Sequence, residues 1–250
     1  MSKLTVHGAK ISSAATSKSD IVVVPLFTGE DLSASASEVN TATGEVLQRA
    51  ISIGDADATL GKITTMVGSG NIARIMSVGC GDRSKFNLEA QLTVTSAMSR
   101  ALAASKAKNA IVLADSIATD KNTLTQFLEF LGRDVAMACY HYTATLGSPK
   151  PGPTFTKLTA AVDSISAAKA KQALAVGATI GSGANLTREL VNLPGNVCTP
   201  SYLAKEGRAL GRRYENLSVS VLDEKKMANM GMGSLLSVGH GSDEPSKLIV

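Results

Sequence analysis

The sequence has 250 residues, of which 44% are hydrophobic and 18% charged, a composition that excludes a disordered chain and allows one large domain or two modest ones. Lys and Arg outnumber Asp and Glu by 25 to 21, but the positive residues are scattered apart from short clusters such as Arg208, Arg212 and Arg213. Aromatic residues are only 4% and Trp is absent, which argues against a dedicated nucleic-acid-binding protein. We interpret the charge mainly as a contribution to solubility.

The cysteines and the first residues indicate the compartment. Cys80, Cys139 and Cys198 are odd in number, far apart and without a C-x-x-C pair, which is typical of a reducing environment. The first 20 residues contain no continuous apolar run, and no stretch approaches the roughly 18 uninterrupted apolar residues of a membrane span. We therefore expect an uncleaved cytoplasmic protein that does not enter a membrane.

The first part of the chain alternates strand-like and helix-like segments, as in an α/β domain. Residues 21–27 form an apolar, β-branched run that predicts a buried strand. Residues 39–51 have apolar side chains at helical spacing, so we expect a single helix there. Residues 62–67 and 74–78 predict two strands, joined by the turn-rich segment 68–71.

Two longer helices are expected next. Asn87 stands at an N-cap position before the Ala-rich segment 88–104, and residues 110–114 predict another buried strand. Residues 122–142 then predict an amphipathic helix. Its apolar face consists of Leu124, Phe127, Leu128, Leu131, Val135 and Cys139.

The densest Pro/Gly cluster, residues 148–153, marks the expected edge of the first domain. We expect residues 155–162 to return as a last strand of its sheet. Residues 165–193 predict a long Ala-rich helix bridging two domains, in which Gly177, Gly181 and Gly183 allow close packing or a kink.

A second α/β domain is expected to open after this helix. Its predicted elements are a helix at 202–214, a strand at 217–222, a short helix near 223–230, a segment around 234–238 and a strand at 247–250. A strand needs neighbours and covering helices to be buried, so the domain is expected to be unfinished. The predicted boundaries are 1–163 for the first domain, 164–196 for the interdomain helix and linker, and 197–250 for the truncated second domain.

Residues that could carry chemistry do not form a recognisable motif. His7, His141 and His240 are too dispersed for metal-ligand spacing. Ser69 and Ser182 lie in G-S-G triplets that lack the spacing of a nucleophile elbow, so we interpret them as turn or helix-packing residues.

Cysteine and methionine side chains are also best explained by packing. Cys80 or Cys139 could be a nucleophile, but no convincing base is nearby, and Cys139 lies on an apolar helix face. We interpret Met227, Met230 and Met232 as gap-filling core residues.

The glycine-rich and acidic segments are equally indecisive. Residues 79–82 follow a strand, as a dinucleotide turn should, but the third glycine and an immediate helix are missing. The acidic residues form two adjacent pairs whose side chains should diverge, and turn or helix-start roles suffice for them. These pairs are Asp223 with Glu224 and Asp243 with Glu244. The residues alone predict a two-domain α/β protein and name no reaction.

A family resemblance comes from the last quarter of the chain. Residues 185–200, N-L-T-R-E-L-V-N-L-P-G-N-V-C-T-P, resemble the interdomain segment of the leucine (cytosol) aminopeptidase family, a two-metal peptidase family. The positions that match are Asn192, Pro194, Asn196, Thr199 and Pro200. Residues 221–245, with Gly231 and Gly233 in a Met-Gly-Met-Gly-Ser run, resemble the next stretch of the family. Residues 1–160 match it only in general layout.

The resemblance implies a fold and an activity. The fold is a three-layer, macro-like α/β domain with a mixed sheet, then a linker helix and the incomplete start of a peptidase-like catalytic domain. The parent enzyme would be a hydrolase that removes N-terminal residues from peptides, using two divalent ions, zinc, manganese or magnesium. The family's metal-binding and catalytic residues would follow a strand like 247–250, so no catalytic, cofactor-binding or metal-binding residue is expected within this chain.

The resemblance therefore predicts the N-terminal part of a leucyl aminopeptidase, inactive and metal-free by itself. The parent would be a cytoplasmic homo-oligomer, a homohexamer in the family. An alternative is a binding module in which the macro-like domain takes DNA, a nucleotide or an ADP-ribose-type ligand. A third possibility is a short paralogue that acts as a structural subunit.

Overall fold

The computed structural model describes residues 4–117 and 120–250. The chain divides into two compact units. Unit 1 contains the residues up to His141 together with Ser148–Asn185, and unit 2 contains Tyr142–Gly147 and Leu186–Val250. Each unit is described by itself below.

Unit 1 is built on a six-stranded sheet with strand order β1-β6-β5-β2-β4-β3. β4 and β3 are antiparallel, whereas all other neighbours are parallel. The strands are β1 (Thr5–Lys10), β2 (Ile21–Leu26), β3 (Ile63–Val67), β4 (Arg74–Gly79), β5 (Asn109–Leu113) and β6 (Lys157–Val162). The mixed, mainly parallel sheet confirms the predicted α/β class.

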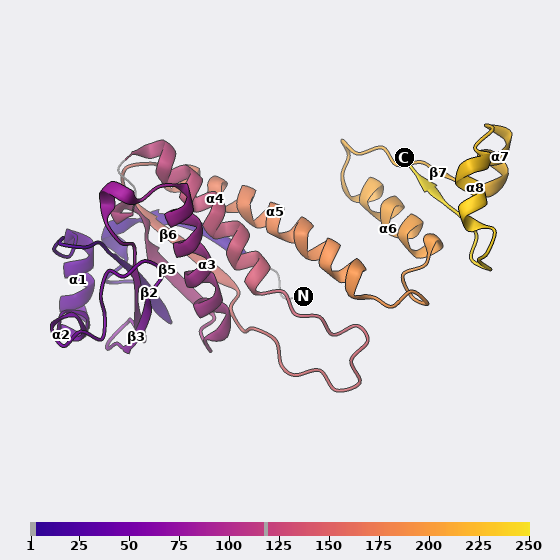
Figure 1. Ribbon diagram of the computed structural model, residues 1–250. Coiled ribbons are helices and arrows are strands. Elements are labelled where there is room, and N and C mark those ends of the chain that lie inside the picture. The colour runs from indigo at the N-terminus through magenta and orange to yellow at the C-terminus, as the bar shows by residue number, and fades with distance from the viewer. Residues whose placement is uncertain (1–3, 118–119) are drawn as a thin grey trace. The chain divides into compact units, whose positions relative to one another are not determined.

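Helices cover both faces of this sheet and make three layers (Figure 1). α1 (Ala34–Ala42) and α2 (Val46–Ser52) lie on one face. The opposite face carries α3 (Leu88–Ala104), α4 (Lys121–Ala138) and α5 (Ala167–Asn192). Short 3₁₀ turns occur at η1 (Ile11–Ser13), η2 (Arg83–Lys85) and η3 (Ala114–Ser116).

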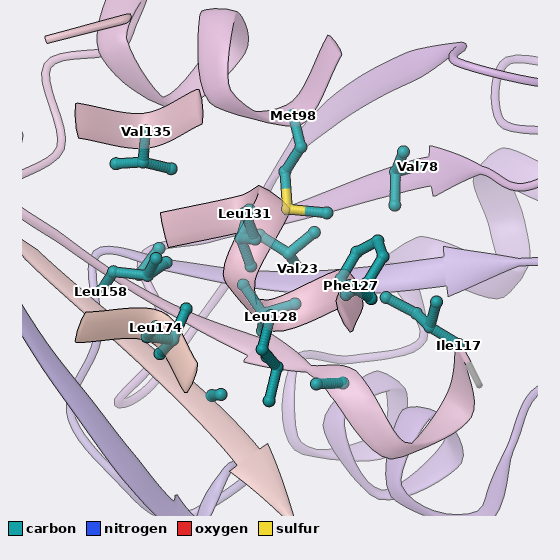
Figure 2. Close-up of a cluster of buried hydrophobic side chains, with 14 of the residues drawn as sticks. Val23, Val78, Met98, Ile117, Phe127, Leu128, Leu131, Val135, Leu158 and Leu174 are labelled. Atoms are coloured by element: carbon teal, nitrogen blue, oxygen red, sulfur yellow. The ribbon is translucent and has the colours of Figure 1, made fainter. Parts of the chain in front are cut away.

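The continuous apolar run of β2 is explained by burial on both faces. Ile21 and Val23 belong to the core under α3 to α5, and Val22 and Val24 belong to the core under α1 and α2. The first of these cores gathers Val23 of β2, Met98 of α3, Phe127 of α4 and Leu174 of α5 (Figure 2). A strand between two helical layers needs apolar residues at every position.

The expected single helix over residues 39–51 is wrong, because two helices occupy this segment. Gly44 and Glu45 have left-handed backbones, with φ of 75° and 58°, which end α1 and start α2 in a new direction. The Asn40 side-chain oxygen accepts hydrogen bonds from the Leu47 and Gln48 amides, at 3.1 and 3.0 Å. This capping contact stabilises the break, and apolar periodicity alone could not predict it.

Other differences concern element limits. No strand was predicted at Thr5–Lys10, yet β1 pairs along its whole length with β6. α4 ends at Ala138, four residues before the expected limit. α3, by contrast, begins and ends as predicted, and the Asn87 side chain accepts a hydrogen bond from the Ala90 amide.

Glycines bring α4 and α5 into close contact. A Cβ on Gly132 would overlap the Leu174 carbonyl oxygen, and a Cβ on Gly177 would overlap the Glu129 carbonyl oxygen. Asn185 Nδ2 donates to the Ala136 carbonyl at 2.8 Å within the same contact. Gly177 and Gly181 of α5 therefore serve close packing, one of the two predicted possibilities, whereas a Cβ on Gly183 would meet nothing within 4 Å.

Unit 2 contains short elements around a small core. They are α6 (Pro200–Arg213), β7 (Val221–Leu222), α7 (Glu224–Asn229), α8 (Gly233–Gly239) and β8 (Leu248–Ile249). β7 and β8 pair antiparallel, so the strand expected at 217–222 is shorter than predicted, and the segment at 234–238 is helical. Among the described hydrophobic side chains of this unit, only Ala204 and Met227 are fully buried.

No helix within residues 4–117 and 120–250 combines the length and apolar character needed to cross a membrane.

Candidate functional site

A crevice of about 690 Å³ lies at the carboxyl ends of β2 and β4 in unit 1. β2 continues into α1 on one face of the sheet, whereas its neighbours β4 and β5 lead to α3 and α4 on the other face. The chain thus leaves adjacent strand ends in opposite directions, which opens a gap between the connecting loops. Ligand sites of open α/β sheets occur at such points.

One wall of the crevice is an ion pair stacked on an aromatic ring. Arg83 Nε and Nη2 donate to the two carboxylate oxygens of Glu30 at 2.6 and 2.8 Å, and the guanidinium lies 3.6 Å from the Phe27 ring centroid. Arg83 also donates to the carbonyl oxygens of Ser116 and Ile117. These contacts hold Arg83 in one position, and its hydrogen bonds lower the pKa of Glu30.

Another part of the lining is the loop before β3, where Asp57 accepts hydrogen bonds. Lys62 Nζ donates to one carboxylate oxygen at 2.8 Å and the Thr59 amide donates to the other at 2.8 Å. The Lys62 hydrogen bond is the largest cause that lowers the pKa of Asp57 to about 2.

The turn at residues 79–82 contributes Gly81 to the lining of the crevice. Gly81 has φ of 72°, and its amide donates to the Ala58 carbonyl at 2.7 Å. Asp82 caps the short 3₁₀ turn η2 by accepting from the Ser84 amide, and α3 begins only at Leu88. No long helix starts directly after the turn, so the arrangement that binds a dinucleotide pyrophosphate is missing here.

Gly81 of the crevice belongs to the turn at residues 79–82, which was considered as a dinucleotide turn, but none of the charged residues of the lining was predicted from the sequence as a site residue. Glu30 and Arg83 are 53 positions apart in the chain, and neither belongs to a motif. The available signal was that both follow predicted strands at a short distance, where parallel strands bring their carboxyl ends to one edge.

The cysteines have the properties of packing residues. Burial raises the pKa of Cys80 to about 12 and that of Cys139 to about 11. A thiol that stays protonated near neutral pH is a poor nucleophile.

The candidate serines and histidines make local contacts. The Ser69 hydroxyl donates to the Ala42 carbonyl at 3.5 Å, and the Ser182 hydroxyl donates to the Ala178 carbonyl at 2.8 Å within α5. His7 lies on β1, and burial is the main cause that lowers its pKa. His141 Nε2 lies 2.7 Å from the Lys150 carbonyl oxygen, and His240 follows α8 in unit 2.

In unit 2, the acidic pair at 223–224 has the predicted helix-start role. The Asp223 side chain accepts from the Lys226 amide at 2.9 Å and caps α7, which lowers the pKa of Asp223. Glu224 accepts from the Ser246 amide at 2.8 Å, while Asp243 and Glu244 are exposed in a loop. Across residues 4–117 and 120–250, no group of three or more His, Cys, Asp or Glu could hold a metal ion.

The methionines of this unit differ from one another. Met227 is fully buried, as expected, but Met230 is 60% exposed and Met232 is half-buried. The expectation that all three fill the core is therefore wrong for Met230, which follows directly on the short helix α7.

The matched segment around residue 199 has the expected local geometry. The Thr199 side chain caps α6 by accepting from the Tyr202 amide, and Pro200 occupies the first turn. Gly231 has φ of 74°, which suits the turn before α8.

Comparison with known proteins gives two successive matches. A sequence profile described as the N-terminal domain of the cytosol aminopeptidase family matches residues 23–148, and the profile of the same family's catalytic domain matches residues 185–250. A probable cytosol aminopeptidase of Alkalilimnicola ehrlichii is 34% identical over 97% of the chain, which covers 50% of that relative. The chain spans about half the length of the curated relatives it matches.

Solved structures share the fold. A mutant tomato leucine aminopeptidase has a TM-score of 0.80 at 19% identity, over 99% of this chain and 50% of that one. The bottromycin maturation enzyme BotP in complex with Mn has a TM-score of 0.70 at 20% identity, over 92% of this chain and 44% of that one.

Proposed function

The chain belongs to the cytosol aminopeptidase family, and we propose that it forms part of a metal-dependent enzyme that removes N-terminal residues from peptides. It contains the family's N-terminal region and the first part of its catalytic domain. The observation that carries the proposal is the succession of the two family matches, in order and in one chain, at 23–148 and 185–250. The activity belongs to a polypeptide with a complete catalytic domain.

Two divalent ions, zinc, manganese or magnesium, are the proposed cofactors of this complete enzyme. Such ions activate a water molecule and stabilise the charge that develops on the peptide carbonyl. The described residues of this chain do not fit such a site, because no cluster of metal ligands occurs among them and Asp223 and Glu224 both accept backbone hydrogen bonds within unit 2. We place the metal-binding and catalytic groups outside residues 1–250, and we expect the chain by itself to be inactive.

We also propose a domain division, an assembly and a location. The division is 1–163 for the N-terminal domain, 164–196 for the interdomain helix and linker, and 197–250 for the start of the catalytic domain. The gap between the two family matches supports a boundary region between residues 148 and 185. A homohexamer in the cytoplasm is the proposed form of the whole enzyme; the description of the relatives as cytosol aminopeptidases supports the location.

Turnover of L-leucine p-nitroanilide in the presence of Mn²⁺ tests the proposal. The 250-residue chain is compared with a chimera in which the second half of the Alkalilimnicola ehrlichii relative follows Val250, and with that relative in full as the positive control. We expect no turnover by the chain, turnover by the chimera, and loss of that turnover with EDTA. Hydrolysis by the 250-residue chain alone, with two ions bound per chain, would contradict the assignment of the metal site.

The alternative of a phosphate-binding module is less well supported. Glu30, Asp31 and Asp57 line the crevice at the strand ends, and Arg83 is already paired with one of them. Like charges disfavour a nucleotide diphosphate there. A gel-shift assay with DNA at increasing salt concentrations tests for a DNA-binding role, since phosphate contacts weaken steeply as salt increases.

A further inference from the structure

The crevice at the carboxyl ends of β2 and β4 is lined by apolar as well as polar side chains. Among the apolar ones, Leu26 and Ala56 are buried, and Leu32, Ile51 and Ala58 are partly buried. A volume of about 690 Å³ is within the range of small-molecule sites, which combine apolar walls with a few polar groups. The volume and lining therefore suit a small molecule that has both an apolar part and a polar group.

The charged groups of the crevice are compensated in two pairs. Glu30 is bound by Arg83, and Asp57 is bound by Lys62. Both cations are used by these contacts, so neither is available to an anionic ligand without loss of an existing ion pair. A carboxylate or phosphate ligand is thereby disfavoured.

One charge of the lining is left over. Asp31 stands in the loop between β2 and α1, and within residues 4–117 and 120–250 its carboxylate has no ion-pair partner. The crevice thus combines apolar lining residues with a single uncompensated negative charge.

We propose that this crevice binds a small apolar primary amine, whose alkyl part packs on Leu26, Ile51 and Ala58 and whose ammonium group faces Asp31. The inference comes from the crevice alone and does not depend on peptidase activity. The alkyl group supplies the burial energy, and the ammonium group balances the charge of Asp31.

Amide shifts in a ¹H–¹⁵N spectrum of the 250-residue chain test the proposal. The crevice contains Gly29, Gly54 and Gly81, whose glycine amides give resolved reporters. The probes are 3-methylbutylamine, 3-methylbutanol as its neutral analogue, 4-methylpentanoate as an anionic analogue, and ADP. We expect the amine to shift all three glycine amides with saturation, the alcohol to bind about threefold more weakly, and both anions to leave the amides unchanged.

Two variants and a matched control identify the groups. Asp31→Asn should weaken amine binding about threefold, as for other exposed ion pairs, and leave alcohol binding unchanged. Asp55→Asn is the control, because Asp55 lies in the loop before β3 but does not itself line the crevice. Ala58→Leu fills the crevice and should abolish binding of both probes.

Three results would overturn the proposal: no saturable shift of the glycine amides with the amine, binding of ADP at least as tight as that of the amine, or equal weakening by Asp31→Asn and Asp55→Asn. None of these results bears on the peptidase proposal, which is tested by turnover of the chimera. Conversely, an inactive chimera leaves the amine titration of the 250-residue chain unaffected.

Discussion

Replacement of Asn40 by Ala is expected to destabilise unit 1 by about 2–4 kcal/mol. The Asn40 side-chain oxygen is the acceptor for the amides of Leu47 and Gln48 at the start of α2. The Leu47 amide is buried, and leaving it without a partner costs about 1–3 kcal/mol. The Gln48 amide is partly accessible, so losing this second capping bond adds about 1 kcal/mol.

The Asn40→Ala change can be measured by urea unfolding followed by far-UV circular dichroism. With a slope of about 2 kcal/mol per molar urea, the midpoint should fall by about 1–2 M, and exchange of the Leu47 amide should become faster. Asn40→Asp is the matched control, because it keeps an acceptor oxygen and should recover most of the loss. If Asn40→Ala unfolds within 0.25 M of the unmodified chain, a difference of about 0.5 kcal/mol, the capping explanation for the break between α1 and α2 is refuted.

Three further predictions concern packing, capping and pH. Gly177→Ala places a Cβ against the Glu129 carbonyl and should lower the free energy of unfolding, measured by thermal unfolding, by about 1–3 kcal/mol. Gly183→Ala is the control: its Cβ meets nothing within 4 Å, so it should be neutral or slightly stabilising. Thr199→Ala should weaken α6 by about 1 kcal/mol, measured by amide exchange in its first turn, with Thr199→Ser as the control. The pKa of Asp57 is lowered from 3.8 to about 2, so the contribution of this carboxylate to stability is complete above about pH 4 and is lost as the pH falls through 2. Asp57→Asn should remove this part of the acid dependence of unfolding. A titration of the Asp57 carboxyl group by NMR with a midpoint near 4 would contradict the prediction.

Elements defined by local residues could be predicted from the sequence. β2 has apolar residues at every position because helices cover both faces. α3 has its cap at Asn87 and α6 at Thr199, and both signals lie next to the helix that they start. The pattern of residues 185–200 likewise indicates the family from a short stretch of sequence.

Features that depend on distant contacts could not be predicted. β1 becomes a strand because it pairs with β6. Thr5 lies opposite Lys157, which is 152 positions later in the chain. The crevice is formed by loops after β2 and β4 and before β3, and its ion pair joins Glu30 to Arg83 across 53 positions. Neither the pairing of β1 with β6 nor the charge balance of the crevice can be recognised in a short window of sequence.

The place of β6 in the sheet has a consequence for how unit 1 is made on the ribosome. β1 is the first strand to be synthesised, but its neighbour in the sheet is β6, the last, which lies between β1 and β5. β1 must therefore wait, unpaired, until residues up to Val162 have left the exit tunnel, because β6 cannot join the sheet earlier. A nascent chain halted before that point would expose the edge of β5 and an unattached N-terminal segment, both of which favour association with other chains.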